Sequence, residues 1–157
     1  KNDPFTLMAW VNFDDLTGYH AVIVKRDNTD YKGYWFGSNG SNLYFALGNG
    51  GSGNYIDAST NTGILAIGKW FLVAATYSGS SDVSGVKFYI NGNLQTDADA
   101  TNALTLSFST TNVFQLGKQV GDTTLALNGK MDEAAVFNRE LSAAEIKAIY
   151  NKGRIIH

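Results

Sequence analysis

The sequence predicts an all-β protein, an antiparallel sandwich of two sheets with one short helix near the C-terminus. Two stretches indicate this fold class. Trp70–Tyr77 is apolar on both of its alternating faces, which is typical of a strand covered on both sides in the middle of a sandwich. Val86–Ile90 alternates in character and ends at Asn91-Gly92, a dipeptide that favours tight hairpins. Both stretches are therefore predicted as strands of an antiparallel sandwich.

Composition limits the classes of protein to which the chain can belong. Its 157 residues suffice for one domain with a sizeable core, and no repeat or boundary divides them, so we expect a single domain over 1–157. The net charge of −2 provides no basic surface for nucleic acid or an anionic membrane. The chain has no cysteine, which excludes disulfides, a thiol nucleophile and a cysteine-ligated zinc site. No apolar run approaches the roughly 20 residues of a membrane span, so we expect no membrane insertion.

The first half of the chain predicts strands separated by polar loops. Alternation of apolar residues indicates the first strand, and a glycine-rich segment marks the loop at Asn49–Asn54. Asn39–Asn42 is expected to turn a hairpin, and Arg26–Lys32 is expected to be a polar loop. The predicted strands are Phe5–Phe13, His20–Lys25, Gly33–Ser38, Leu43–Gly48 and Tyr55–Ala58.

The second half of the chain predicts three further strands and the helix. Ser142 and Glu145 form a capping box, with serine as the N-cap and glutamate three residues later, and Gly153 is a plausible stop. The remaining segments are expected to be a polar connection at Ala98–Ala103, short strands at Leu104–Phe108 and Val113–Gly117, a loop at Lys118–Thr124 and a strand at Leu127–Phe137.

Several of these stretches resemble a known family. They are Phe5–Val11, Lys69–Tyr77, Val86–Gly92 and Asn128–Ser142, the last of which contains Asp132-Glu133 and Asn138-Arg139-Glu140-Leu141-Ser142. They resemble, in order, the early, central and closing strands of the laminin-G-like, concanavalin-A-like jelly rolls. The resemblance implies a two-sheet jelly roll over nearly the whole chain. It implies no single function, because one fold hosts many activities.

The N-terminal end departs from this family pattern. Family members usually begin with one more strand, whereas only Lys1–Pro4 precede Phe5 here. We therefore expect either a longer parent protein or an open sheet edge that a neighbouring domain or subunit covers.

The acidic residues argue against an enzyme. Jelly-roll glycosidases use two carboxylates on one sheet face, because an acid and a nucleophile must flank the same bond. The three glutamates, Glu133, Glu140 and Glu145, are never two or four residues apart. Only His20 and His157 could serve a lyase or a hydrolytic triad, and no motif surrounds either. We therefore expect no catalytic residues, and a glycoside hydrolase or polysaccharide lyase is the least favoured reading.

Two polar loops could supply calcium ligands. Calcium takes six to eight oxygens from carboxylates, amides and carbonyls. The loops also resemble those of pentraxins, relatives with the same jelly roll, in which the second loop follows a Leu-Gly such as Leu116-Gly117; related jelly rolls can hold calcium near the last strand as well. The alternative is that these are ordinary turn residues, favoured by side-chain-to-backbone hydrogen bonds. The metal candidates are Asp27, Asn28, Asp30, Gln119, Asp122 and Asp132.

Aromatic and amide residues near the loops could bind a sugar. Sugars present C–H faces that stack on aromatic rings and hydroxyls that pair with planar polar groups. Tyr34 and Trp35 point to opposite faces of their strand, so one of them is expected to face outward. A packing role remains the alternative for any single tyrosine. The ligand-binding candidates are Tyr31, Tyr34, Trp35, Asn54 and Tyr55.

The sequence thus favours a noncatalytic module that binds a glycan or glycoconjugate, with calcium as a candidate cofactor. Charged residues make up only 17% of the chain, against roughly 25% in an average soluble domain, which is common in extracellular β-proteins. We expect a secreted or surface-displayed protein, or a module of an enzyme or adhesin, whose site lies in the loops around 26–35, 49–55 and 118–124. The alternative is a structural protein of a surface fibre or virion, in which the sandwich is a scaffold.

Overall fold

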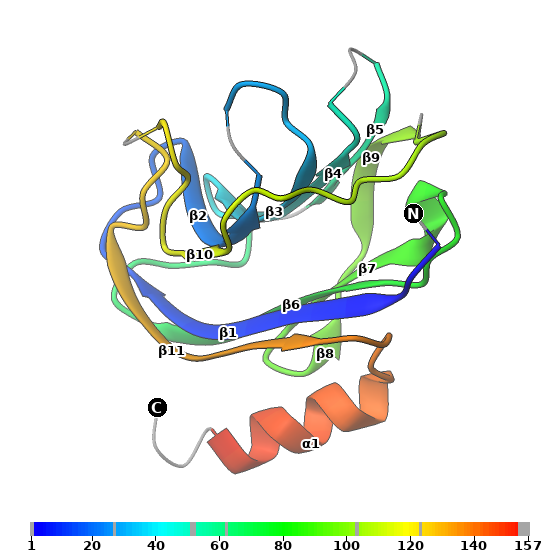
Figure 1. The fold of residues 1–157 in the computed structure, drawn as a ribbon. Helices are drawn as coiled ribbons and strands as arrows, with labels where there is room; N and C mark the ends of the chain where they lie inside the picture. Colours follow the sequence, from blue (N-terminus) through cyan, green and yellow to red (C-terminus); the bar gives the residue numbers. More distant parts are fainter. Residues whose placement is uncertain are drawn as a thin grey trace.

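The structure of the chain is a computed structural model that describes residues 2–26, 28–50, 53–61, 63–102, 104–122 and 124–153, with no side chains for 97–102. It confirms the predicted fold class. Two antiparallel sheets face each other, and one helix lies against the outer side of one of them (Figure 1).

The sheets contain five and six strands. In spatial order, the five-stranded sheet consists of β11 (Gly129–Phe137), β1 (Phe5–Phe13), β6 (Trp70–Tyr77), β7 (Val86–Ile90) and β8 (Asn93–Leu94). The six-stranded sheet consists of β10 (Gln115–Leu116), β2 (Tyr19–Lys25), β3 (Gly33–Asn39), β4 (Asn42–Gly48), β5 (Tyr55–Thr60) and β9 (Asp97–Asn102). A short 3₁₀ helix, η1 (Val83–Gly85), precedes β7.

Strand β1 shows how the core is divided. All nine of its residues are buried. Phe5, Leu7 and the other odd-numbered residues pack between the two sheets, whereas Met8 and Trp10 pack under the helix α1 (Ala143–Gly153). The alternation predicted from sequence is therefore present, and each face meets a different apolar layer because the helix covers the outer side of this sheet.

The predicted capping box begins helix α1. The backbone N–H of Ser142 donates to Glu145 Oε2 at 2.9 Å, and the N–H of Glu145 donates to Ser142 Oγ at 3.3 Å. Ile146 is fully buried against the sheet, and Tyr150 stacks on Trp10 with 5.7 Å between ring centroids. No helix among the described residues is long and apolar enough to cross a membrane.

Two predictions for the region after β8 were wrong. The polar connection expected at Ala98–Ala103 is largely the strand β9, whose backbone pairs with β5; Ala103 itself lies outside the described residues. The strand expected at Leu104–Phe108 is irregular. Leu104 and Phe108 pack into the core, where the Phe108 ring lies 5.9 Å from that of Phe5, whereas Leu106 is exposed. Both predictions were wrong because they relied on composition. Residues 97–102 form a strand through backbone pairing with β5 despite their polar sequence, and residues 104–108 are irregular although apolar side chains from them pack into the core.

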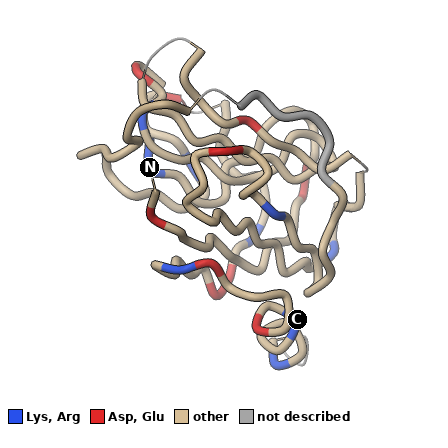
Figure 2. Tube along the Cα trace, turned by 90° about the vertical axis from the view of Figure 1, so that its right-hand side faces the viewer, with Lys and Arg blue, Asp and Glu red and all other residues tan. Residues whose placement is uncertain are grey.

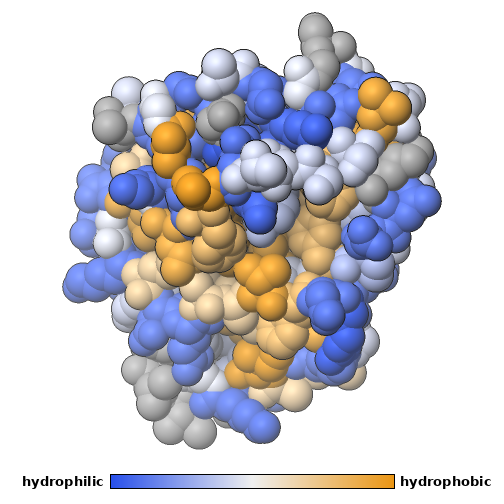
Figure 3. Space-filling view, viewed as in Figure 1, coloured by the Kyte–Doolittle hydropathy of each residue, from blue (hydrophilic) through white to orange (hydrophobic). Residues whose placement is uncertain are grey.

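The neighbouring elements match expectation more closely. β10 is limited to two residues within the predicted Val113–Gly117, and β11 begins at Gly129, two residues later than expected. The segment 104–114 crosses the open side of the sandwich in Figure 1, and apolar side chains gather on this face in Figure 3. Lys and Arg are dispersed among Asp and Glu along the described chain (Figure 2).

Candidate functional site

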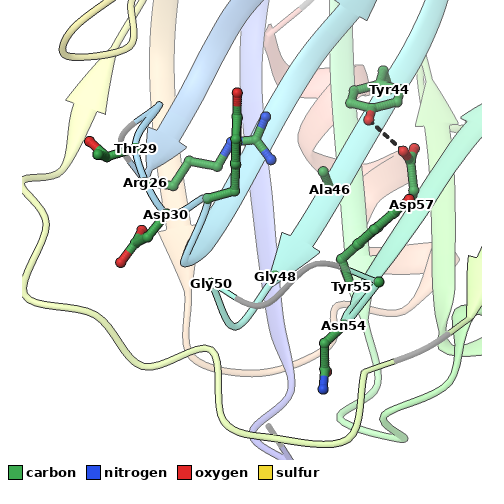
Figure 4. A pocket seen from close by; sticks show the side chains of 12 residues that line it. Arg26, Thr29, Asp30, Tyr44, Ala46, Gly48, Gly50, Asn54, Tyr55 and Asp57 are labelled. Carbon is green, nitrogen blue, oxygen red and sulfur yellow. Dashed lines mark hydrogen bonds between the residues drawn. The ribbon is translucent and has the colours of Figure 1, made fainter.

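A cavity of about 530 Å³ lies on the face of the six-stranded sheet that points away from the sandwich core (Figure 4). Along β4, Phe45 and Leu47 pack into the core, whereas Tyr44, Ala46 and Gly48 line the cavity on the other face. Further lining residues come from β5 and from the loops that precede β3 and β5. They are Arg26, Thr29, Asp30, Tyr31, Gly50, Gly53, Asn54, Tyr55 and Asp57.

The strand register explains the hollow. Across β3, β4 and β5, Trp35 opposes Ala46, and Ala46 opposes Asp57. Two residues further along β4, on the same face, Gly48 opposes Tyr55. Small residues therefore occupy the central strand, with larger side chains on either side of them. A side chain at Gly48 would place its Cβ 2.6 Å from the carbonyl oxygen of Tyr31, so the loop before β3 can lie this close only over glycine.

Aromatic side chains form one wall of the cavity and its rim. Trp35 is buried on the cavity side of the sheet, where its ring makes edge contacts with Tyr19 at 6.0 Å and with Tyr44 at 5.5 Å between centroids. Tyr31 and Tyr55 line the cavity but remain 54% and 37% exposed. These two rings offer the accessible faces on which a ligand could stack.

Arg26 brings a positive charge into the cavity. Its guanidinium lies over the ring of Tyr31, 5.2 Å from the centroid, and 6.0 Å from that of Trp35. The Nε atom is buried without a hydrogen-bond partner, and the guanidinium has no ion pair with any described carboxylate. Burial lowers the pKa of Arg26, but an arginine in a protein stays protonated. The cavity therefore contains a positive charge that forms no close ion pair with a described carboxylate, although the charge of Asp57 raises the pKa of Arg26.

Asp57 and Tyr44 form a polar pair on the opposite side of Ala46. The Tyr44 hydroxyl donates to Asp57 Oδ2 at 2.7 Å (Figure 4). Burial raises the pKa of Asp57, while the hydrogen bond from Tyr44 and the charge of Arg26 partly oppose that rise. Burial and the Asp57 carboxylate also raise the pKa of Tyr44. Asp57 can thus accept hydrogen bonds from ligand hydroxyls at a fixed position.

The structure brings together four of the five predicted ligand residues. Tyr31, Asn54 and Tyr55 line the cavity, and Trp35 packs on the same face. Tyr34 lies on the opposite face, where its ring packs 5.4 Å from that of Phe5. The sequence expectation that Tyr34 and Trp35 point oppositely is therefore confirmed, and their role in ligand binding stays a prediction.

The Asn54 amide has a structural task. It donates through Nδ2 to Thr105 Oγ1 at 2.6 Å and accepts through Oδ1 from the Thr105 N–H at 2.8 Å. Asn54 therefore joins the start of β5 to the segment that crosses the sandwich. Its place in the cavity is that of a positioning residue.

Sequence reasoning missed four polar lining residues: Thr29, Tyr44, Asp57 and, as an individual side chain, Arg26. A signal for two of them was present. Tyr44-x-Ala46-x-Gly48 places small residues beside a tyrosine on one strand face, and Tyr55-x-Asp57 does the same with a carboxylate on the next strand. Only the pairing of β4 with β5 shows that these two patterns meet.

The predicted calcium loops touch each other. Asn28 Nδ2 donates to the carbonyl oxygen of Gly121 at 2.6 Å. Gln119 is buried, and neither polar atom of its amide has a hydrogen-bond partner among the described residues. Asp122 Oδ1 accepts hydrogen bonds from Thr124 N–H at 2.9 Å and from its hydroxyl at 2.6 Å, which lowers the pKa of Asp122. This junction contains one buried, unsatisfied amide beside an acidic turn.

Two of the other metal candidates, Asp30 and Asp132, have contacts away from this junction. Asp27 lies outside the described residues. Asp30 Oδ1 accepts from the Lys32 N–H at 2.8 Å, and Asp30 lines the aromatic cavity. Asp132 Oδ1 accepts from the Glu133 N–H at 2.7 Å and lines a second, more open depression. Within the described part of the chain, no three His, Cys, Asp or Glu side chains form a metal-binding group, so calcium stays a prediction.

Solved structures share the fold at low sequence identity. They include the binding domain of Paraclostridial Mosquitocidal Protein 1 (TM-score 0.71, 17% identity, 96% of this chain and 37% of that one). A proposed carbohydrate-binding protein from Bacteroides ovatus has a TM-score of 0.64 and 17% identity over 93% of this chain and 40% of its own. Botulinum neurotoxin type C, whose cell entry depends on interaction with two ganglioside molecules, has a TM-score of 0.64 and 19% identity. That match covers 96% of this chain and 36% of the neurotoxin chain.

The chain spans 40% or less of the length of these three proteins, and at this identity they show the fold alone. A comparison with curated proteins finds no match. A family does match, over residues 1–147, and it is described as concanavalin A-like lectins and glucanases. With its two-sheet sandwich and a match over most of its length, the chain belongs to the concanavalin A-like lectin/glucanases superfamily.

Proposed function

We propose that this protein is a noncatalytic carbohydrate-binding module and that the cavity over β3, β4 and β5 is its sugar site. One observation carries the proposal: two exposed tyrosine rings stand beside a floor of small residues that also presents a guanidinium and a carboxylate. Aromatic faces stack on the C–H faces of sugars, and planar charged groups pair with hydroxyls. The cavity combines both.

The dimensions and the floor support a small glycan. About 530 Å³ is within the range of roughly 300–1,000 Å³ that small-molecule sites occupy. Ala46 and Gly48 leave space above β4, and the Tyr44–Asp57 hydrogen bond holds one acceptor group beside that space. The floor belongs to paired strands, which favours binding without large rearrangement.

The described acidic residues favour binding over catalysis. Two carboxylates line the cavity, those of Asp30 and Asp57. The Asp30 carboxylate accepts a backbone hydrogen bond and points away from Asp57 in Figure 4. A glycosidase needs both carboxylates on opposite sides of a single bond.

Glycan-array binding followed by calorimetry tests the sugar site. We expect at least one glycan to bind, and Tyr55→Ala to weaken it about fivefold to tenfold, because an aromatic contact contributes roughly 1–1.5 kcal/mol. Tyr150→Ala is the matched control, since this tyrosine packs under the other sheet. Absence of glycan binding, or equal affinities for Tyr55→Ala and the unmodified protein, would contradict the proposal. Release of sugar products would identify an enzyme instead.

We also propose calcium at the junction of the two polar loops. The buried Gln119 amide without a partner is the observation that supports it, and Asn28, Gln119 and Asp122, with Asp27, would hold the ion. Bound calcium would neutralise this acidic turn and join the loops. At 100 times its dissociation constant, calcium would raise the free energy of unfolding by about 2.7 kcal/mol.

A thermal melt in millimolar calcium or in EDTA tests this site. We expect a higher melting temperature with calcium and no such rise in Asp122→Ala, while Asp132→Ala behaves like the unmodified protein. The reverse result would assign the ion to Asp132, and the absence of any rise would remove calcium altogether.

We propose finally that the module acts outside the cell, secreted or displayed on a surface. Its low content of charged residues, 17%, is common in extracellular β-proteins, and its structural neighbours include toxin binding domains. Fractionation of the source cells with an antibody to this chain tests the location. Recovery only from the cytoplasm would refute it.

A further inference from the structure

Arg26 is the least satisfied group in the cavity. Its aliphatic stem enters from the end of β2, and its guanidinium lies against the rings of Tyr31 and Trp35. Its Nε atom is buried without an acceptor among the described residues, and Asp57, which also lines the cavity, forms no ion pair with it. A buried Nε–H group without an acceptor is costly, so a ligand that supplies an acceptor to this half-buried guanidinium gains free energy.

The position of the guanidinium indicates which acceptors would fit. The rings of Tyr31 and Trp35 lie 5.2 and 6.0 Å from the guanidinium carbon, and the N–H donors of the guanidinium are the groups left for a ligand. A planar carboxylate matches two such donors at once and also neutralises the charge, which a neutral hydroxyl cannot do. Asp57 lies across Ala46 and already accepts from Tyr44, so it is placed for hydroxyls of the same ligand.

We propose that the sugar recognised in this cavity carries a carboxylate, as uronic and sialic acids do, and that Arg26 binds that carboxylate through two parallel hydrogen bonds. The inference rests on the proposed carbohydrate-binding function and specifies its substrate class. Tyr31 and Tyr55 then stack on the sugar, and Asp57 accepts from its hydroxyls. Arg26 is the specificity-determining residue of the site.

Calorimetry with matched probes tests this assignment. One pair is a glucuronic-acid disaccharide and its carboxyl-reduced analogue, and the other is sialyllactose and lactose. We expect one of the acidic probes to bind about tenfold to a hundredfold more tightly than its neutral counterpart, the range expected for hydrogen bonds to a charged group. Which pair shows the difference distinguishes a uronic from a sialic acid.

Three variants distinguish direct binding of the ligand carboxylate by Arg26 from long-range attraction by positive charge. Arg26→Met is expected to remove the preference, so that the acidic probe binds no more tightly than the neutral one. Lys32→Met is the control: it removes the same charge from the other end of the same loop, at a residue that does not line the cavity, and is expected to leave both affinities unchanged. Arg26→Lys keeps the charge but loses the planar fork, so we expect about a tenfold loss for the acidic probe alone. If near-ultraviolet circular dichroism shows that Arg26→Met is unfolded, Arg26→Lys is used as the test variant in its place.

The outcomes distinguish this inference from the function on which it rests. Equal binding of acidic and neutral probes, weakened equally by Arg26→Met, would overturn the carboxylate assignment and leave the sugar site intact. A loss with Lys32→Met as large as with Arg26→Met would also overturn it, because long-range charge would then explain the preference. Failure of every glycan to bind would refute the proposed function and the inference together.

Discussion

The hydrogen bond between Tyr44 and Asp57 gives the sharpest test of the cavity's polar structure. Tyr44→Phe removes the hydroxyl that donates to Asp57 Oδ2 at 2.7 Å and leaves the ring contacts in place. Asp57→Asn keeps an acceptor oxygen but removes the charge. The double variant closes a thermodynamic cycle that measures how much the charge of Asp57 strengthens this hydrogen bond, because the amide oxygen of Asp57→Asn can still accept from Tyr44.

The expected coupling free energy depends on how exposed Tyr44 and Asp57 are to solvent. A hydrogen bond to a charged group contributes roughly 1.5–3 kcal/mol when it is well buried. Both Tyr44 and Asp57 are only half-buried, so solvent screens the carboxylate and the value is smaller. We expect a coupling free energy of about 1 kcal/mol at neutral pH, measured by urea unfolding of all four proteins.

The pH dependence has a definite sign. Burial raises the pKa of Asp57 above its ordinary 3.8, so above that pH the folded protein binds more protons at this site than the unfolded chain. The contribution of Asp57 to stability is therefore largest below pH 3.8 and is lost as pH rises through the raised pKa. Tyr44→Phe removes an interaction that lowers this pKa, so it should extend the loss to higher pH. Asp57→Asn, which has no group that titrates at this position, should abolish this pH-dependent loss of stability.

Urea unfolding at pH 4 and pH 7 checks both expectations. Tyr150→Phe is the control, since it deletes a hydroxyl on the other side of the molecule. A coupling free energy near zero, or an unchanged pH dependence in Asp57→Asn, would refute the reasoning.

Three further predictions follow from individual contacts. Gly48→Ala should lower the free energy of unfolding, measured in urea, by about 1–3 kcal/mol and should weaken glycan binding, because the added Cβ would displace the carbonyl of Tyr31. An unchanged free energy of unfolding and an unchanged affinity would contradict the close approach of the loop to Gly48. Glu145→Gln should lower the melting temperature above pH 4.5 but not near pH 2, because the hydrogen bond from Arg139 lowers the pKa of Glu145 to about 2 and its stabilisation disappears as pH falls through that value. A pH-independent difference would exclude this cause. Ile146→Ala should cost about 2–5 kcal/mol in urea unfolding, since this side chain is fully buried, and a loss below 1 kcal/mol would mean that the helix contributes little.

Much of the fold could be predicted from local pattern. The double-sided apolar run of β6, the alternation of β1 and the capping box of α1 each have a physical cause within a few neighbouring residues. The family resemblance then supplied the arrangement of the strands, which agrees with the match over residues 1–147.

The candidate site was predicted only in part. The sequence drew attention to Tyr31, Trp35, Asn54 and Tyr55 because aromatic and amide residues cluster near the polar loops. It did not distinguish a tyrosine at the rim of a cavity from one in the core, such as Tyr34. It also spread the metal candidates over three places, because composition alone does not tell which turns meet.

The sequence by itself determined the fold class, the family, the capped helix and the alternation that sends every second side chain outward. Only the tertiary structure decided that Ala46 lies between Trp35 and Asp57 and that the loop before β3 crosses Gly48. It also decided that Arg26 reaches the cavity without an ion pair to any carboxylate that the structure describes. The physical reason is distance along the chain. Period-two patterns are local, whereas cross-strand register joins residues that are far apart in sequence. This register places Asp57 and Tyr55 beside Ala46 and Gly48, and the loop before β3 adds Arg26 and Tyr31 to the same hollow.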